Sequence, residues 1–248
     1  MKYARNFLTK VIFQLQFSPM LALLKEAPAD FQEAVKEDFP RLKVVKQLEA
    51  AAKISKEGFE PLPVKQTARW IFEAEDRSKS VTLAADLFSI EYQQYQSLEV
   101  LRQDFERTWG LFQHEHRVEI LTRVGLRYIN EVAIPGGSPF EWTGYIADTL
   151  VHSAVNVPTA DFGKLRSMHH LVLGKDADRC VFQYGLFNKD FPNPIAERRF
   201  TLDYDCFTTE ELSASEATLK LQYYNDVITT LFEASISDEL RRLMGEVE

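Results

Sequence analysis

Arginines on a predicted strand are the first residues of this sequence that could do chemistry. Residues 120–134, ILTRVGLRYINEVAI, alternate with period two, so that Arg123, Arg127 and Glu131 share one face and apolar side chains share the other. The two arginines lie roughly 13 Å apart along the predicted strand. They could bind one extended anionic partner or hold separate acids, because guanidinium groups pair with carboxylates and phosphates. Gly125, on the same polar face, leaves room for another backbone or a ligand.

Two pairs of carboxylates have the same-face spacing that acid chemistry needs. Asp203 and Asp205 point to one side of the predicted strand LDYDCF, and Glu73 and Glu75 do the same in WIFEAED. Same-face neighbours are about 7 Å apart, which suits paired acids in hydrolysis or the ligation of a metal ion. The alternative is that these acids form cross-strand ion pairs with the two arginines or lie on a solvated face of the sheet.

The histidines do not predict a metal site. His114 and His116 are two residues apart near the end of a predicted helix and therefore point in different directions. His169 and His170 are neighbours on a predicted strand and face opposite sides. The sequence has no phosphate-binding glycine motif and no Gly-x-Ser-x-Gly motif, so we predict no cofactor and no catalytic residue.

Length, charge and cysteine usage bound the class of protein. The chain has 248 residues, enough for one large domain or two small ones. Its net charge of −8 argues against an extended phosphate-binding surface, so nucleic acid is not the expected partner. Cys180 and Cys206 lack the spacing of a metal site and have apolar neighbours, which predicts buried thiols in a reducing compartment. No apolar run is long enough to span a membrane and the N-terminus does not read as a signal peptide, so we predict a cytoplasmic protein.

Hydrophobic periodicity predicts alternating strands and helices along the whole chain. The predicted strands are 11–17, 69–76, 80–94, 120–134, 166–173, 179–187 and 198–207. The predicted helices are 31–39, 97–116, 140–151, a long helix after the capping box at 213–216, and a short one from 238. We expect Asp30, Ser97 and Ser237 to cap three of these helices. Residues 43–54 fit either a helix or a strand, and residues 58–63 and 156–163 are predicted loops.

The predicted elements occur in the same order twice. Each half contains a strand, a short helix, about three strands and a long helix, although the halves share little residue identity. We predict an α+β protein in which a duplicated β-α-β-β-β-α unit, 1–118 and 119–248, forms a continuous antiparallel sheet or a partial barrel. The two long helices are expected to pack on one face of this sheet, in one compact structural unit.

Three segments carry a resemblance to a known family. They are YARNFLTKVIFQLQFSP at 3–19, TRVGLRYIN at 122–130 and LFEASISDELRRLMG at 231–245. Together they resemble a sporadically distributed family of uncharacterised bacterial proteins of about this length. The resemblance implies no catalytic motif, so no functional residue is carried over from it. A sporadic distribution is typical of mobile genes such as those of phage defence and toxin–antitoxin systems.

These observations lead to a prediction of function and two alternatives. We predict a non-enzymatic binding protein whose polar sheet surface engages a partner protein or a small anionic ligand in a cleft between the two halves. The surface would consist of Arg123, Arg127, Glu131, Asp203 and Asp205. One alternative is a metal-dependent hydrolase or nuclease that uses the strand-borne carboxylates. The other is an accessory of a bacterial defence system, such as an acidic antitoxin-like protein, and a homo-oligomer is compatible with all three.

Overall fold

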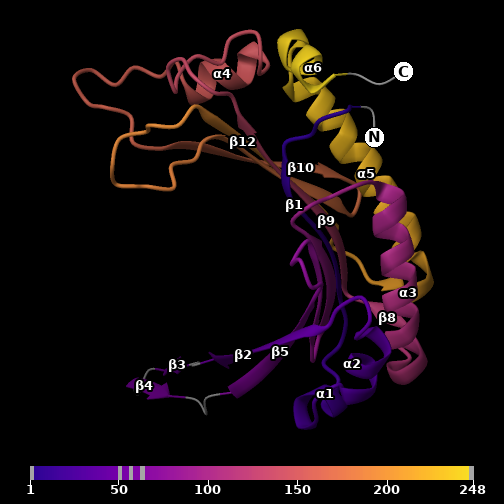
Figure 1. Ribbon diagram of the computed structural model, residues 1–248. Coiled ribbons are helices and arrows are strands. Elements are labelled where there is room, and N and C mark those ends of the chain that lie inside the picture. Colours follow the sequence, from indigo (N-terminus) through magenta and orange to yellow (C-terminus); the bar gives the residue numbers. More distant parts are fainter. Residues whose placement is uncertain (1–2, 50–51, 56–57, 62–64, 246–248) are drawn as a thin grey trace.

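The protein is built around one open antiparallel sheet of nine strands, in the order β10-β11-β12-β9-β1-β7-β6-β5-β2. The computed structural model describes residues 3–49, 52–55, 58–61 and 65–245. Figure 1 shows that the sheet curves strongly, so that its two ends form the arms of a C-shaped molecule. The predicted α+β class with a large antiparallel sheet is confirmed, and no barrel is closed.

The strands follow the predicted alternation closely. In the large sheet they are β1 (Leu8–Gln16), β2 (Arg41–Glu49), β5 (Lys65–Glu73), β6 (Lys79–Ala84), β7 (Leu87–Tyr92), β9 (Arg123–Ala133), β10 (Ser167–Lys175), β11 (Asp178–Leu186) and β12 (Arg199–Thr208). Two small two-stranded sheets pair β3 (Ala52–Ser55) with β4 (Gly58–Pro61), and β8 (Ile120–Leu121) with β13 (Leu212–Ser213).

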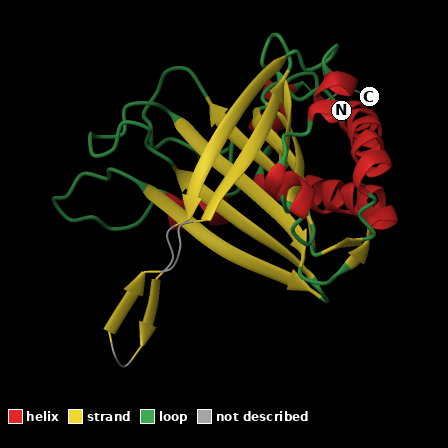
Figure 2. Cartoon of the chain, turned by 90° about the horizontal axis from the view of Figure 1, so that it is seen from below, coloured by secondary structure: helices red, strands yellow, loops and turns green. Residues whose placement is uncertain are grey.

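The helices lie on one side of the large sheet, its convex side, as Figures 1 and 2 show. The two long ones are α3 (Leu98–His116) and α5 (Ala217–Ser235). The short ones are α1 (Leu21–Lys25), α2 (Ala29–Val35), α4 (Asp148–Ala154), α6 (Asp238–Met244) and the 3-10 turn η1 (Ala214–Glu216). In the described part of the chain, no helix combines the length and apolar character needed to cross a membrane.

The centre of the sheet is the antiparallel pair β1 and β9, with Phe13 opposite Leu126 and Ile12 opposite Arg127. Outward from β1 the strands are β7, β6 and β5, and outward from β9 they are β12, β11 and β10. In both directions the strand beside the central one, β7 or β12, is the last strand of the large sheet before a long helix, although the small strand β13 lies between β12 and α5. Strand β2 extends the first direction by one further strand.

Apolar side chains on the helix-covered face form one continuous core. Val11, Phe13 and Leu15 of β1 are fully buried, and Phe13 packs edge-to-face on Phe105 of α3 with ring centroids 4.8 Å apart. In the second half, Phe182 stacks on Tyr204 with centroids 4.5 Å apart. These rings lie on the faces that period-two alternation assigns to the interior, so the pattern of the sequence directly determines which side of the sheet the helices cover.

Several local predictions are confirmed. Ser97 caps α3 through its side chain, which accepts a hydrogen bond from the Val100 amide. Ser213 and Glu216 form the predicted capping box, although it opens the 3-10 turn η1 before α5 begins. Residues 43–54, which fit two structures, lie mainly in β2 and β3.

Other local predictions are wrong. Asp30 lies inside the first turn of α2, whose N-cap position is Pro28. By contrast, Ser237 does occupy the predicted N-cap position of α6, although its side chain makes no capping hydrogen bond. The helix predicted at 140–151 begins only at Asp148, and the loop predicted at 58–63 contains β4. Residues 139–147 form turns, in which the Trp142 indole donates to the Pro139 carbonyl, because Gly144 has a φ of 85° that a continuous helix does not accommodate.

Replacing Phe13 by alanine tests this core. The ring is fully buried between the central strand and α3, so Phe13→Ala is expected to lower the free energy of unfolding by about 3–5 kcal/mol. Leu219→Ala on α5 is the control, because Leu219 is 72% exposed and should change it by less than about 0.5 kcal/mol. Urea denaturation measures both, and equal effects would contradict the assignment of the buried face.

Candidate functional site

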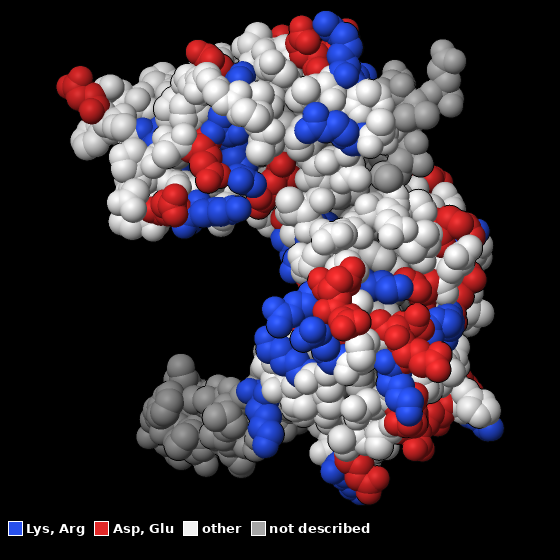
Figure 3. All heavy atoms as spheres, viewed as in Figure 1, with Lys and Arg blue, Asp and Glu red and all other residues white. Residues whose placement is uncertain are grey.

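The polar face of the sheet lines a broad hollow. Because the helices cover the convex side, the opposite, concave face is open between the two arms of the molecule (Figure 3). Arg123 and Arg127 lie on this face of β9, and Asp203 and Asp205 lie on the same face of the adjacent strand β12. We call this surface, formed by the concave faces of β1, β2, β5–β7 and β9–β12, the hollow face.

Arg127 is bound to Asp203 by two parallel hydrogen bonds. Its Nε donates to Asp203 Oδ1 at 2.9 Å and its Nη2 donates to Asp203 Oδ2 at 2.6 Å. The Arg127 side chain is 38% exposed, whereas that of Asp203 is only 10% exposed. The hydrogen bonds to Asp203 are the main reason that the pKa of Arg127 is raised. This bidentate geometry orients the guanidinium plane on the hollow face.

Arg123 makes a looser pair with Asp205. Its Nη2 lies 3.3 Å from both carboxylate oxygens, and the guanidinium also lies over the Phe207 ring, 4.4 Å from the ring centroid. Gly125 makes this position possible, because a Cβ there would lie 2.6 Å from Arg123 Nη1. At Gly125 we expected another backbone or a ligand to come close. The group that comes close is the Arg123 side chain of the same strand.

Burial is the main cause of the raised pKa of Asp205. Desolvation raises the pKa of this carboxyl above its usual value, against the opposing influence of Arg123 and Arg127 and with a further contribution from Asp203. The folded state thus binds a proton on Asp205 more readily than the unfolded chain does. The two aspartates share one patch, but the Asp203 side chain is the more buried, at 10% exposed against 31% for Asp205, and it also has the closer arginine.

Glu131 belongs to a separate cluster on the hollow face. It pairs with Arg199 of β12 and lies 3.6 Å from the Lys189 ammonium. The structure therefore brings four of the five predicted residues into two neighbouring ion pairs and places the fifth further along β9. A depression of about 250 Å³ lies beside the two pairs, and its walls are Ile12, Gln14, Arg123, Gly125, Arg127 and Asp205.

Further cations on the hollow face were not predicted from the sequence. Lys43 of β2 and Arg69 of β5 are exposed there, and neither has an ion-pair partner in the described part of the chain. Lys10 of β1 pairs with Glu91 of β7 at 2.8 Å. The alternation of residues 65–73 could have placed Arg69 on this face. Lys43 could not be placed, because residues 43–54 fit either a helix or a strand.

Over the described strands, cations outnumber carboxylates on the hollow face. The cations are Lys10, Arg41, Lys43, Arg69, Arg123, Arg127, Arg179 and Arg199, and the carboxylates are Glu73, Glu91, Glu131, Asp203 and Asp205. Figure 3 shows blue Lys and Arg side chains gathered along the wall of the hollow. A chain of net charge −8 thus presents a locally basic concave surface.

Of the carboxylates considered for catalysis, Asp203 and Asp205 are held in ion pairs with the two arginines. Within the described residues, no three His, Cys, Asp or Glu side chains are arranged to hold a metal ion. Cys180 and Cys206 face each other across β11 and β12 as free, buried thiols. A hydrogen bond from the Cys206 thiol to Cys180, together with burial, raises the pKa of Cys206, so this thiol stays protonated.

No protein-family model matches the chain, and a search of curated proteins found no significant match.

The role of the bidentate pair can be measured by truncation. Arg127→Ala leaves the Asp203 carboxylate desolvated without its partner, so we expect a loss of about 2 kcal/mol in the free energy of unfolding. Arg127→Ala/Asp203→Asn removes that charge and should cost less than Arg127→Ala alone. Arg242→Ala, which breaks an exposed pair with Glu239, is the control and should cost under about 0.5 kcal/mol. If Arg127→Ala/Asp203→Asn were less stable than Arg127→Ala, this role of the pair would be contradicted.

The raised pKa of Asp205 predicts a pH dependence of stability. Between the unfolded value near 3.8 and the raised folded value, the native state binds more protons, so the Asp205 contribution to stability falls as pH rises. Asp205→Asn cannot titrate, and its stability relative to the wild type should therefore increase as pH rises through this window and level off above it. Urea denaturation from roughly pH 3 to pH 7 measures the difference, and a constant or opposite trend would contradict it.

Proposed function

We propose that this protein is a non-enzymatic binding protein that holds an acidic segment of a partner protein in its hollow. The observation that carries the proposal is the excess of cations on the concave face of an otherwise acidic chain. Charge complementarity steers such a partner toward the hollow and selects against basic ones.

A protein segment fits the hollow face better than nucleic acid does. Carboxylates are interleaved with the cations, for example Glu91 beside Lys10 and Glu131 beside Arg199, and would repel a continuous phosphate backbone. Phe207 is the only aromatic residue on the hollow face of the described strands, so the face offers no platform for stacking bases. Charges of both signs, with cations in excess, instead suit the complementary charged contacts of an acidic protein segment.

Lys43 and Arg69 are the first contacts that we assign to the acidic segment. They are exposed and unpaired, so binding a carboxylate costs no existing ion pair. Arg127 is a second contact, because its Nη1 makes no hydrogen bond within the described residues while Nε and Nη2 hold Asp203. Gln14 and Arg123 beside the depression complete the proposed site.

We further propose that the hollow arises from an internal duplication, with halves 1–118 and 119–248. The matching strand order outward from β1 and from β9, each half ending in a long helix, supports this interpretation. Joining two such units through their first strands leaves an arm on each side of the central pair. The sporadic family that the sequence resembles supports a role as an accessory of a bacterial defence or toxin–antitoxin system in the cytoplasm.

Binding of model peptides tests the function. Fluorescence anisotropy with a labelled glutamate-rich peptide should show saturable binding that weakens with salt, and the lysine-rich counterpart and oligo-dT should bind at least about tenfold more weakly. Lys43→Glu/Arg69→Glu should weaken binding of the acidic peptide by about tenfold, the effect of two rim charges of roughly 0.7 kcal/mol each.

A double variant on the helix side is the matched control. Lys25→Glu/Lys36→Glu makes the same change of net charge on the segment of α1 and α2, on the convex side of the sheet. It should leave binding of the acidic peptide within about twofold of the wild type. Equal losses in both double variants would mean that net charge alone drives binding, and preferential binding of oligo-dT would replace the protein partner by a nucleic acid.

A further inference from the structure

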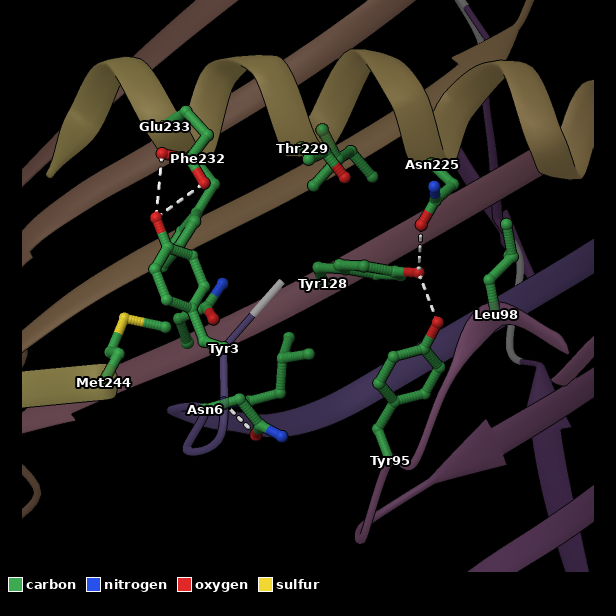
Figure 4. Close-up of a pocket in the computed structure, with 13 residues that line it drawn as sticks. Tyr3, Asn6, Tyr95, Leu98, Tyr128, Asn225, Thr229, Phe232, Glu233 and Met244 are labelled. Atoms are coloured by element: carbon green, nitrogen blue, oxygen red, sulfur yellow. Dashed lines mark hydrogen bonds between the residues drawn. The ribbon is translucent and has the colours of Figure 1, made fainter. Parts of the chain in front are cut away.

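A second, separate cavity lies on the helix side of the central strands (Figure 4). Its volume is about 310 Å³, and it is enclosed by the N-terminal segment, β1, β9, α5, the segment before α3, and α6. Asn6 and Thr229 are exposed to solvent, so the cavity reaches the surface between the N-terminal segment and α5. It lies on the opposite side of the sheet from the hollow face and shares no residue with it.

One end of the cavity carries a chain of neutral hydroxyl and amide groups. The Tyr128 hydroxyl donates to Asn225 Oδ1 at 2.9 Å, and the Tyr95 hydroxyl lies 2.9 Å from that of Tyr128. Since Tyr128 donates its only proton to Asn225, Tyr95 must be the donor to Tyr128. Burial raises the pKa of Tyr95 to about 12 and that of Tyr128 well above its usual value, so both stay protonated.

The other end is charge-compensated. The Tyr3 hydroxyl donates to the Glu233 carboxylate at 2.8 Å, and Arg241 Nε lies 3.2 Å from the same group. Figure 4 shows Tyr3 and Glu233 together at one end of the cavity and the Tyr128–Tyr95 pair at the other. Between them the walls are apolar, with Leu8, Ile228 and Phe232 among them. An uncharged, mainly apolar occupant therefore fits this cavity, because neither end carries an uncompensated charge and the walls between the ends are apolar.

Asn130 supplies a polar group that the protein does not satisfy. This residue of β9 lines the cavity and is only 4% exposed. Its Nδ2 donates to the Leu202 carbonyl at 3.4 Å, whereas its Oδ1 accepts no hydrogen bond from the described residues. Among the described residues the buried side-chain atoms without a partner are His116 Nε2 and Thr201 Oγ1, so Asn130 Oδ1 is instead open to the cavity, where an occupant could donate a hydrogen bond to it.

We propose that this cavity binds an uncharged planar ring compound that donates an N–H or O–H hydrogen bond to Asn130 Oδ1. The tyrosine rings of Tyr3 and Tyr128 and the side chain of Phe232 provide aromatic surface for the ring. The volume lies at the lower end of the range of small-molecule sites, about 300–1,000 Å³, and suits one or two fused rings. The proposal does not depend on the function of the hollow face.

Indole and 1-methylindole are the probes, because they differ only in the hydrogen-bond donor. Isothermal titration of the full chain should show indole binding at one site about tenfold more tightly than 1-methylindole, the effect of one hydrogen bond. Asn130→Leu is close in volume and lacks the acceptor, so it should bind both compounds about equally. Equal affinities in the wild type, or an unchanged preference in Asn130→Leu, would overturn the assignment of Asn130.

A second variant keeps the test informative if Asn130→Leu does not fold. Thr229→Trp on α5 projects a large side chain into the cavity from an exposed position and should abolish binding of both probes. Leu219→Trp, on the same helix and 72% exposed, is the matched control and should bind indole as the wild type does. Failure of the wild type to bind either probe, or unchanged binding in Thr229→Trp, would mean that the cavity holds only water and would overturn the proposal.

Discussion

The pairing of β1 with β9 is the constraint on which the rest of this structure depends. The two strands are distant in the chain, yet their register sets Phe13 against Leu126 on one face and Ile12 against Arg127 on the other. A slip of one residue would exchange these faces along both strands. The register therefore decides at once which side of the sheet the helices bury and which side carries the charges.

The two faces of this central pair have different physical roles. On the convex side, aromatic rings of β1, β7 and α3 pack in edge-to-face and stacked contacts, so this side is covered and provides the core. On the concave side the arms diverge, and the charges remain in contact with water or with each other. A pair such as Arg127 and Asp203 is tolerated there because each group has a partner and one of them still reaches solvent.

Curvature gives the polar face its potential to bind. The cations of β2 and β5 and those of β9 lie on separate strands of one sheet, and bending that sheet turns their side chains toward a common space. On the helix side, Asn130 and Tyr128 of β9 meet the cavity beside α5. The hollow and the cavity thus lie on opposite faces of the sheet and differ in character: the hollow is open and charged, and the cavity is partly enclosed and mainly apolar.

Much of the local structure is determined by the sequence by itself. Alternation in 120–134 identified a strand with Arg123 and Arg127 on its polar face, and Ser97 and the capping box at 213–216 marked the starts of the long helical segments. These features are local, because side-chain period and capping depend only on residues a few positions apart. The same reasoning was wrong at 140–151, where Gly144 adopts a positive φ, and at Asp30, which lies inside the first turn of α2 instead of capping it.

Only the tertiary structure decided which charges meet. Alternation places Arg127 on a face but cannot name its partner, which is Asp203 on a strand 76 residues away. It also could not place Lys43, since residues 43–49 form part of a strand through their pairing with β5, or show that Asn130 would face a cavity. Periodicity specifies the face of a strand, whereas neighbours across a sheet are set by long-range register and curvature, which no local pattern encodes.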